Sequence, residues 1–301
     1  MKNAESTAKQ SETDASDGGK PARRPRVATS PKISTKGPSK AFRDEKSVFK
    51  PHIERTAKPE DGDDMRLNKY VALCGLAARR KASEMILAGD IEVNGGVCKA
   101  PGYRVLPNDE VKHNGKLLKP VENFIYILMN KPKDTITTVS DERGRKTVMQ
   151  LVGRTIKERI FPVGRLDRDT TGLLLLTNDG DLAQKMSHPS YKIKKLYHVG
   201  LDRPLTKHDF EAIVNGLELE DGTAEIDSIS HPEGAGKDEI MLEIHIGKNR
   251  IVRRIFEKLG YQVERLDRVY YGGLTKKDLP RSGYRSLTSR EVIMLKHFTG
   301  K

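Results

Sequence analysis

The chain has only two cysteines among its 301 residues, and this scarcity excludes several classes of site. Cys74 and Cys98 form no CxxC pair and have no nearby pair of histidines. A zinc site or a thiol redox motif would need such a spacing. The chain is also long enough to bury a core without disulfides. Both cysteines are therefore expected to pack as small apolar side chains.

Long apolar runs are also missing. No stretch approaches the roughly 20 apolar residues that a membrane-spanning helix needs. The start of the chain, MKNAESTAKQ, lacks the apolar core of a secretory signal. These two absences predict a soluble, cytoplasmic protein.

Acidic residues are outnumbered by basic ones. Fifty-five Lys and Arg residues stand against 42 Asp and Glu residues, which leaves a formal charge of +13. Such a surplus favours a polyanionic partner, and nucleic acid is the first candidate. An anionic membrane is the weaker one, because no basic amphipathic helix with a bulky aromatic face is predicted.

Residues 1–64 hold few large apolar side chains, too few to offset the conformational entropy lost on folding. We therefore expect a disordered, basic N-terminal tail. From Lys20 to Arg43 it carries eight basic residues and no acidic one, which suits loose contact with phosphates. A tail that only improves solubility fits the same composition.

Residues 65–120 have the pattern of a compact module. Apolar residues at 67–74 recur at helical spacing, and a second helix is expected over 79–88. IEV at 91–93, followed by Asn94-Gly95, indicates a strand and a hairpin turn. Further short strands are expected before residue 120.

The stretch RLNKYVALCGLAARRKASEMILAGDIEVNGGVCKAPGYRV resembles the S4 RNA-binding domain, a small fold of a ribosomal protein and several RNA-modifying enzymes. The resemblance implies an RNA contact on the exposed side of the two helices. The basic residues expected there are Arg66, Lys69, Arg79, Arg80 and Lys81. Each taken alone fits a solvated helix face, but their concentration favours binding of a folded RNA.

A linker near residues 120–124 leads into a second, larger region. FIYILM at 124–129 has the composition of a buried strand, and EIMLEIHI at 239–246 alternates like a half-buried one. Helical spacing appears at 251–259 and 289–297. Strands dominate without a regular βαβ repeat, so residues 124–298 are expected to form an α+β domain with an antiparallel or mixed sheet.

One segment of this region concentrates polar chemistry. In FPVGRLDRDTTG (161–172) the carboxylate of Asp167 lies between Arg165 and Arg168, and four leucines follow directly. Nearby positive charge favours the ionised carboxylate. A structural ion pair or a calcium loop would use similar residues, although Asn178 stands where a calcium loop needs glutamate. Asp179-Gly180 predicts a hairpin turn.

GRLDRDTTGLLLLTNDGDLA (164–183) is similar to the signature of the RsuA/RluB-type family of pseudouridine synthases. Further motifs follow in the family's order: NKP at 130–132, KLY at 195–197, GKNRIVRRIF at 247–256 and LDRVYYGG at 266–273. The resemblance implies an α+β protein: a small S4 α/β module, then a catalytic domain on a mixed, mostly antiparallel sheet with flanking helices.

Two positions depart from the family pattern. After NKP the family usually has one residue and then glycine, whereas this chain has Lys133-Asp134, so the local turn can differ. Ile251 stands where the family often has glutamine, and its side chain cannot supply a direct hydrogen bond.

The resemblance implies that Asp167 is the catalytic nucleophile, acting at the sugar C1′ or at the base. Arg253 is expected to pair with Asp167 and orient it. Tyr197 is expected to lie against the uracil and to handle the proton at C5, although a tyrosine at strand spacing could belong to the core.

The other basic residues of the motifs are expected to hold RNA. Arg165 would displace the base or bind a phosphate, and Lys131, Lys248 and Arg250 would contact the RNA backbone. Arg254 is interpreted as a solvent-facing neighbour. The isomerisation needs no redox change and no transferred group, so no cofactor and no metal are expected.

The implied function is the synthesis of pseudouridine in ribosomal RNA by a monomer, on a nucleotide turned out of its stack. The GKNRIVRR sequence favours large-subunit (23S) rRNA, and small-subunit (16S) rRNA is the alternative. Two other classes are disfavoured. A non-catalytic rRNA-binding assembly factor would be expected to lose the GRLD carboxylate or the following arginine motif, and both are present. A metal-dependent hydrolase or nuclease would have to use Asp167 and Asp169 together.

Overall fold

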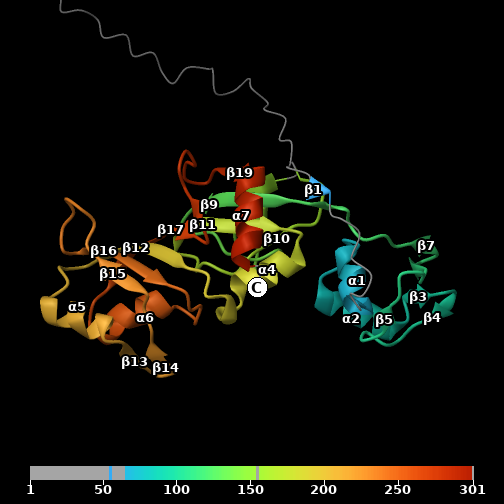
Figure 1. The fold of residues 1–301 in the computed structure, drawn as a ribbon, viewed down its shortest axis with the longest axis horizontal. Coiled ribbons are helices and arrows are strands. Elements are labelled where there is room, and N and C mark those ends of the chain that lie inside the picture. Colours follow the sequence, from blue (N-terminus) through green and yellow to red (C-terminus); the bar gives the residue numbers. More distant parts are fainter. Residues whose placement is uncertain (1–53, 56–64, 154–155, 300–301) are drawn as a thin grey trace, which may run out of the picture. The chain divides into compact units, whose positions relative to one another are not determined.

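The computed structural model describes residues 54–55, 65–153 and 156–299 (Figure 1). The predicted tail, residues 1–64, lies outside these ranges except for Glu54–Arg55 (β1), which pairs with Asn123–Phe124 (β8) in antiparallel fashion. Within the described ranges, no helix is both long and apolar enough to cross a membrane.

Residues 65–118 fold around a small core of their own. Two helices, α1 (Leu67–Leu73) and α2 (Arg79–Ala88), pack together. The strands are β2 (Met65–Arg66), β3 (Ile91–Val93), β4 (Gly96–Val97), β5 (Arg104–Val105), β6 (Val111–His113) and β7 (Lys116–Leu117). Asn94 and Gly95 join β3 to β4 with φ of 52° and 81°. Two successive positive φ angles are what a type I′ hairpin turn requires, so the predicted hairpin is confirmed.

Residues 126–299 build a larger α+β unit. Its strands are β9 (Tyr126–Lys131), β10 (Phe161–Pro162), β11 (Thr171–Thr177), β12 (Lys195–Leu201), β13 (Leu217–Leu219), β14 (Gly222–Ala224), β15 (Ser228–Ser230), β16 (Glu239–Ile244), β17 (Val263–Tyr271), β18 (Leu274–Thr275) and β19 (Tyr284–Ser286). Its helices are α3 (Val148–Val152), α4 (Gly180–Ser187), the short 3₁₀ turn η3 (Pro189–Tyr191), α5 (Lys207–Val214), α6 (Ile251–Lys258) and α7 (Ser289–Thr299).

Nine of these strands form one sheet. β15, β16, β12, β17, β11, β9 and β19 follow one another, with β10 beside β11 and β18 beside β17. Among the described strand pairs of this sheet, β11 and β17 run parallel and the others antiparallel. The expected mixed, mostly antiparallel sheet is therefore confirmed.

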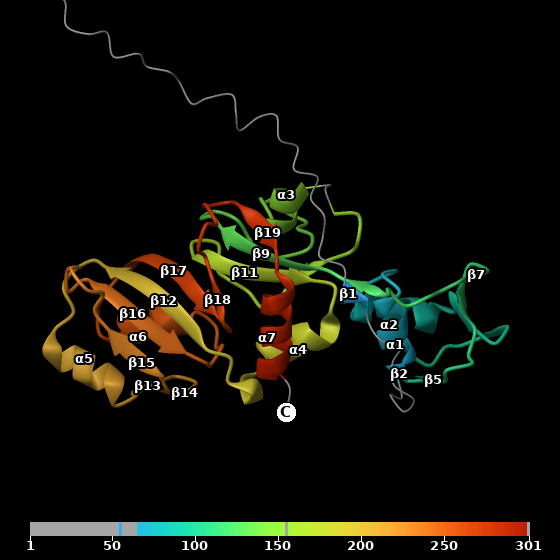
Figure 2. The same cartoon turned by 45° about the horizontal axis from the view of Figure 1, so that its top comes forward.

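The central strands are apolar on both faces because helices cover both. Leu173 and Leu175 of β11 pack with α4 and α7, which lie together against β9 and β11 in Figures 1 and 2. Leu174 and Leu176 point the other way, into the core that α3, α5 and α6 complete. Successive residues of a strand point to opposite faces, so four leucines in a row suit a strand that is buried on both sides.

Asp179 begins helix α4, so the predicted hairpin turn at Asp179-Gly180 is wrong. Its carboxylate accepts hydrogen bonds from the backbone N–H groups of Asp181 and Leu182, at 3.1 and 2.9 Å. These N–H groups have no partner inside a helix, and aspartate is a preferred N-cap because it binds them. Asp-Gly after a strand therefore starts a helix here.

Candidate active site

The loop at residues 164–170, the ends of β12 and β17, and the turn before α6 surround a cavity of about 250 Å³. The polar residues that line it include Arg165, Asp167, Lys195, Tyr197, Lys248, Arg250 and Arg268. Pockets for drug-sized ligands hold about 300–1,000 Å³. The cavity is therefore of a size for one small ring system.

Asp167 presents its carboxylate at this cavity with 37% of its side chain exposed. Arg250 Nη1 lies 3.9 Å from Asp167 Oδ2. The backbone from Asp167 to Thr170 forms a turn, in which the N–H of Thr170 donates to the carbonyl of Asp167 at 3.1 Å. The predicted nucleophile is thus reachable, faces a cation and sits in a tight loop.

The side chain of Lys131 supports the loop that carries Asp167. The predicted contact between Lys131 and the RNA backbone is therefore wrong. The side chain is fully buried at the end of β9. Its ammonium donates to the carbonyl oxygens of Asp167 and Thr170, at 2.9 and 2.7 Å. Burial lowers the pKa of Lys131 to about 8, opposed by the charges of Asp169 and Asp167. Lys131 fixes the loop that carries the carboxylate, where no phosphate can reach it.

Arg253 does not pair with Asp167 as predicted. Its Nη2 lies 2.8 Å from Asp169 Oδ2, and its Nη1 donates to the carbonyl of Val263 at 2.7 Å. The side chain projects from α6 and is only 7% exposed. The carboxylate of Asp169 is therefore paired with Arg253, and Arg250 is the cation that approaches Asp167.

Tyr197 is 8% exposed and belongs to both the core and the cavity wall. It lies on β12 directly opposite Arg268 of β17. Lys195, two residues earlier on β12, lies opposite Tyr271. Directly opposed residues of two strands point to the same face, so these four side chains form one patch beside the cavity. This is where an inserted ring would meet Tyr197.

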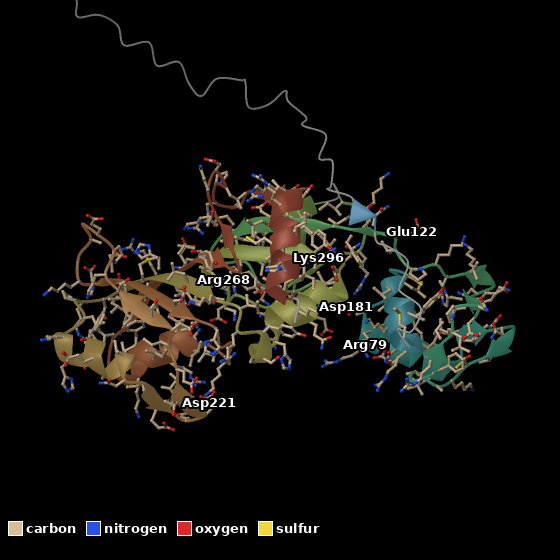
Figure 3. All side chains as sticks on the ribbon, in the orientation of Figure 1. Arg79, Glu122, Asp181, Asp221, Arg268 and Lys296 are labelled. Carbon is tan, nitrogen blue, oxygen red and sulfur yellow. The ribbon has the colours of Figure 1, made fainter. Side chains whose placement is uncertain are left out.

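The remaining motif arginines and lysines have different surroundings. Arg165 is exposed beside Asp167 at the cavity. Lys248 donates to the carbonyl of Asp221 at 2.7 Å, in the turn between β13 and β14. Arg254 forms an ion pair with the same Asp221, which is labelled in Figure 3; it is partly exposed and does not line the cavity. Arg165 and Arg250 are therefore the cations most open to an incoming RNA at this cavity.

Comparison with known proteins shows the family to which the chain belongs. Residues 125–258 match the RNA pseudouridylate synthase family, and residues 65–111 match the S4 domain. The ribosomal large subunit pseudouridine synthase B of Bacillus subtilis (strain 168) is 39% identical over 234 residues, which cover 77% of this chain and 95% of that protein. The chain belongs to the RNA pseudouridine synthase family.

Two other matches agree. An uncharacterized RNA pseudouridine synthase of Aquifex aeolicus is 38% identical to this synthase over 235 residues, 77% of this chain and 94% of that one. A solved structure described as a pseudouridylate synthase superposes with a TM-score of 0.55 at 27% identity, covering 77% and 99% of the two chains. The resemblance that the sequence motifs indicated is confirmed, and the synthase is an isomerase.

Two residues of the synthase's cavity were missed by the sequence interpretation. Lys195 donates to the carbonyl of His245 at 2.6 Å, and burial lowers its pKa to about 8, with a further contribution from the charge of Arg268. Arg268 is 3% exposed and lines the same cavity. Strand periodicity could have found both, because Lys195 precedes Tyr197 by two residues and Arg268 follows the cavity residue Leu266 by two.

The two departures from the family pattern have simple local outcomes. Asp134 adopts a φ of +59°, the left-handed conformation that glycine occupies most readily. The synthase therefore keeps a left-handed turn after NKP, with aspartate in it. Ile251 is buried and lines the cavity, so an apolar contact stands at that position.

The S4 module of the synthase displays its basic residues unevenly. Arg66, Arg79, Arg80 and Lys81 are exposed, and Lys69 is half-buried. Arg79, labelled in Figure 3, donates from Nε to the side-chain oxygen of Asn68 at 3.3 Å, which links the start of α2 to α1. The predicted cluster thus gathers around the starts of the two helices.

Proposed function

We propose that the protein isomerises one uridine of large-subunit (23S) ribosomal RNA and uses Asp167 as its nucleophile. The observation that carries the proposal is a half-exposed Asp167 beside a base-sized cavity that Tyr197 also lines. The name of the B. subtilis relative supports the choice of subunit. A 16S rRNA uridine is the alternative target.

The reaction breaks the C1′–N1 bond, forms a C1′–C5 bond, and moves the proton of C5 to N1. The uridine has to leave its stack before the cavity can receive it. Asp167 attacks either C1′ or the base, and both routes detach the base while it stays in the cavity. Tyr197 lies against the ring and handles the proton at C5.

Three contacts prepare this chemistry. Lys131 fixes the backbone of the nucleophile loop, and Arg253 ties Asp169 to α6. Arg250 approaches the carboxylate of Asp167, with Nη1 3.9 Å from Oδ2. Preorganised groups of this kind avoid reorganisation during the reaction. Arg165, exposed at the cavity, binds a phosphate or fills the space that the flipped base leaves in the RNA stack.

The RNA partner is a stem-loop or an assembling subunit, bound by a monomer in the cytoplasm. The exposed cluster around Arg66, Arg79, Arg80 and Lys81 supports contact between the S4 module and RNA phosphates. Lys69 completes that cluster in the proposal, and Lys248 reaches RNA only if it releases the carbonyl of Asp221.

The test is a map of pseudouridines in the rRNA of cells with and without the gene. One modification in 23S rRNA should disappear, return with the wild-type gene and stay absent with Asp167→Asn. A loss confined to 16S rRNA would select the alternative target. An unchanged map, together with a subunit-assembly defect that Asp167→Asn repairs, would indicate an assembly factor instead.

A further inference from the structure

Arg268 is a buried cation at the base of the cavity. It lies on β17 (Figure 3) and is 3% exposed, yet it is one of the residues that line the cavity. Gly172 is its neighbour in the parallel pair of β11 and β17, and a Cβ at Gly172 would lie 2.3 Å from the carbonyl oxygen of Arg268. This close approach places Arg268 beside the strand that leaves the Asp167 loop.

The guanidinium of Arg268 has N–H donors that lack a partner within the described part of the chain. A guanidinium has five N–H groups, and Nε donates to the carbonyl of Leu173 at 2.8 Å. Nη2 is sealed from solvent and has no partner. The cation also lies 4.4 Å from the centre of the Tyr271 ring. Among the described residues, no carboxylate forms an ion pair with it.

A buried charge with so few partners costs folding free energy. The register of the sheet shows what it faces. β12 and β17 shift by one residue between Leu196 and Tyr197, which brings Arg268 opposite Tyr197 and Tyr271 opposite Lys195. Tyr197 and Arg268 therefore point to the same face, and a ring that lies against Tyr197 presents its edge near the guanidinium.

The proposed reaction creates the charge that such a group complements. When C1′–N1 breaks, the base takes the electron pair, and the negative charge spreads to its carbonyl oxygens. Attack of a carboxylate on the base also places negative charge on a carbonyl oxygen. Whether Asp167 attacks C1′ or the base, negative charge therefore develops on the carbonyl oxygens of the uracil.

We propose that Arg268 is a catalytic residue: it donates hydrogen bonds to a carbonyl oxygen of the flipped uracil and stabilises the negative charge that develops there. The inference rests on the proposed function. A fixed donor in a site without water is worth more than one in solvent, because the surroundings need not reorganise. An RNA phosphate is a poorer fit, since the exposed Arg165 and Arg250 meet the backbone first.

The test combines a protein variant with single-atom changes in the substrate. Arg268→Gln and wild type are compared under single turnover on an rRNA fragment that carries uridine, 2-thiouridine or 4-thiouridine at the mapped position. Sulfur accepts hydrogen bonds weakly. We expect Arg268→Gln to slow the uridine reaction about 10²-fold. Sulfur at the contacted position should slow wild type but add little to the slow variant.

Arg265→Gln is the matched control, because Arg265 is an exposed arginine of the same strand that pairs with Glu239. It should react like wild type with all three substrates. If thermal unfolding shows that Arg268→Gln does not fold, Arg268→Lys replaces it. Lysine keeps the positive charge but lacks the planar guanidinium with its paired N–H donors. The response of Arg268→Lys to sulfur should be weaker than that of wild type.

The proposal is overturned if, at both positions, sulfur changes the rate of wild type and of the Arg268 variant by the same factor. It is equally overturned if Arg268→Gln is as fast as Arg265→Gln. Wild type without activity on any rRNA fragment would instead refute the proposed function. A loss that appears only as weaker RNA binding, and that grows with salt, would show a phosphate contact.

Discussion

Arg253 forms its ion pair with Asp169, two residues beyond the proposed nucleophile, with Nη2 and Oδ2 2.8 Å apart. The arginine is almost completely buried, whereas 39% of the aspartate side chain is exposed. Two neighbouring carboxylates therefore have separate tasks. Asp169 anchors the loop to α6, and Asp167 remains available to substrate beside Arg250.

The two aspartates should respond differently to the same isosteric change. Asp169→Asn leaves the charge of Arg253 without its partner and should lower the free energy of unfolding by about 1–2 kcal/mol. Asp167→Asn should leave it within about 0.5 kcal/mol, yet reduce pseudouridine formation roughly 10⁴-fold or more. Urea unfolding and a single-turnover assay of both variants test the division. Equal stability losses would contradict it.

Lys131 should support catalysis without touching RNA. Lys131→Met removes the donors to the carbonyls of Asp167 and Thr170, so stability should fall by about 2–3 kcal/mol. The loosened loop should lower kcat about 10²-fold. Lys133→Met, at an exposed lysine two residues away, is the control and should change neither. A variant of Lys131 that mainly weakens RNA binding would restore the phosphate-contact interpretation.

Local pattern predicted much of the fold. The apolar run FIYILM at 124–129 indicated a buried strand, and β9 (Tyr126–Lys131) is buried along its whole length. Asn94-Gly95 indicated a hairpin that both positive φ angles bear out. The S4 module and the nature of the sheet followed from resemblance to a family. The cavity also forms around Asp167, the residue that the GRLD motif singled out.

Contacts between distant segments could not be predicted in the same way. Lys131 and Thr170 meet only because β9 and β11 are adjacent strands, and nothing near Lys131 in the sequence indicates its burial. The choice of Arg253 between Asp167 and Asp169 depends on how α6 packs. Asp179 was misread because an Asp-Gly pair serves a hairpin and a helix start equally well.

Gly172 should be essential for the pairing of β11 with β17. At its φ of +105°, a Cβ would lie 2.3 and 2.5 Å from the backbone oxygen and nitrogen of Arg268, which cannot move without breaking the sheet. Gly172→Ala should therefore cost about 3 kcal/mol or more. Gly180→Ala, at the first residue of α4 with open space around it, should be neutral or slightly stabilising. Thermal unfolding of both variants measures the contrast.

Asp134 tests the departure from the family turn. Its left-handed backbone strains an aspartate by about 1 kcal/mol. Its carboxylate lies 3.1 Å from Arg168 Nη2, but both side chains are well exposed, so the ion pair contributes less than that. Asp134→Gly should leave stability unchanged or raise it slightly, and Asp134→Ala should lower it. A clear loss in Asp134→Gly would show that the ion pair outweighs the strain.

Lys194 and Lys195 are adjacent lysines whose titration should have opposite effects on stability. Burial lowers the pKa of Lys195 to about 8, with the charge of Arg268 acting in the same direction and that of Asp227 against it. The hydrogen bond and charge of Glu243 raise the pKa of the exposed Lys194 above its ordinary value. The unfolded chain binds the proton of either lysine up to about pH 10.5.

Between pH 8 and 10.5 the unfolded state therefore keeps a proton that the folded state has lost from Lys195, and stability rises with pH there. Across that window wild type should gain roughly 3 kcal/mol relative to Lys195→Met. Relative to Lys194→Met, wild type should instead lose stability as the pH passes through the raised pKa of Lys194, because there the folded state binds the proton more tightly. Urea unfolding from pH 7 to 11 separates the two signs, and parallel curves for both variants would contradict the buried charge of Lys195.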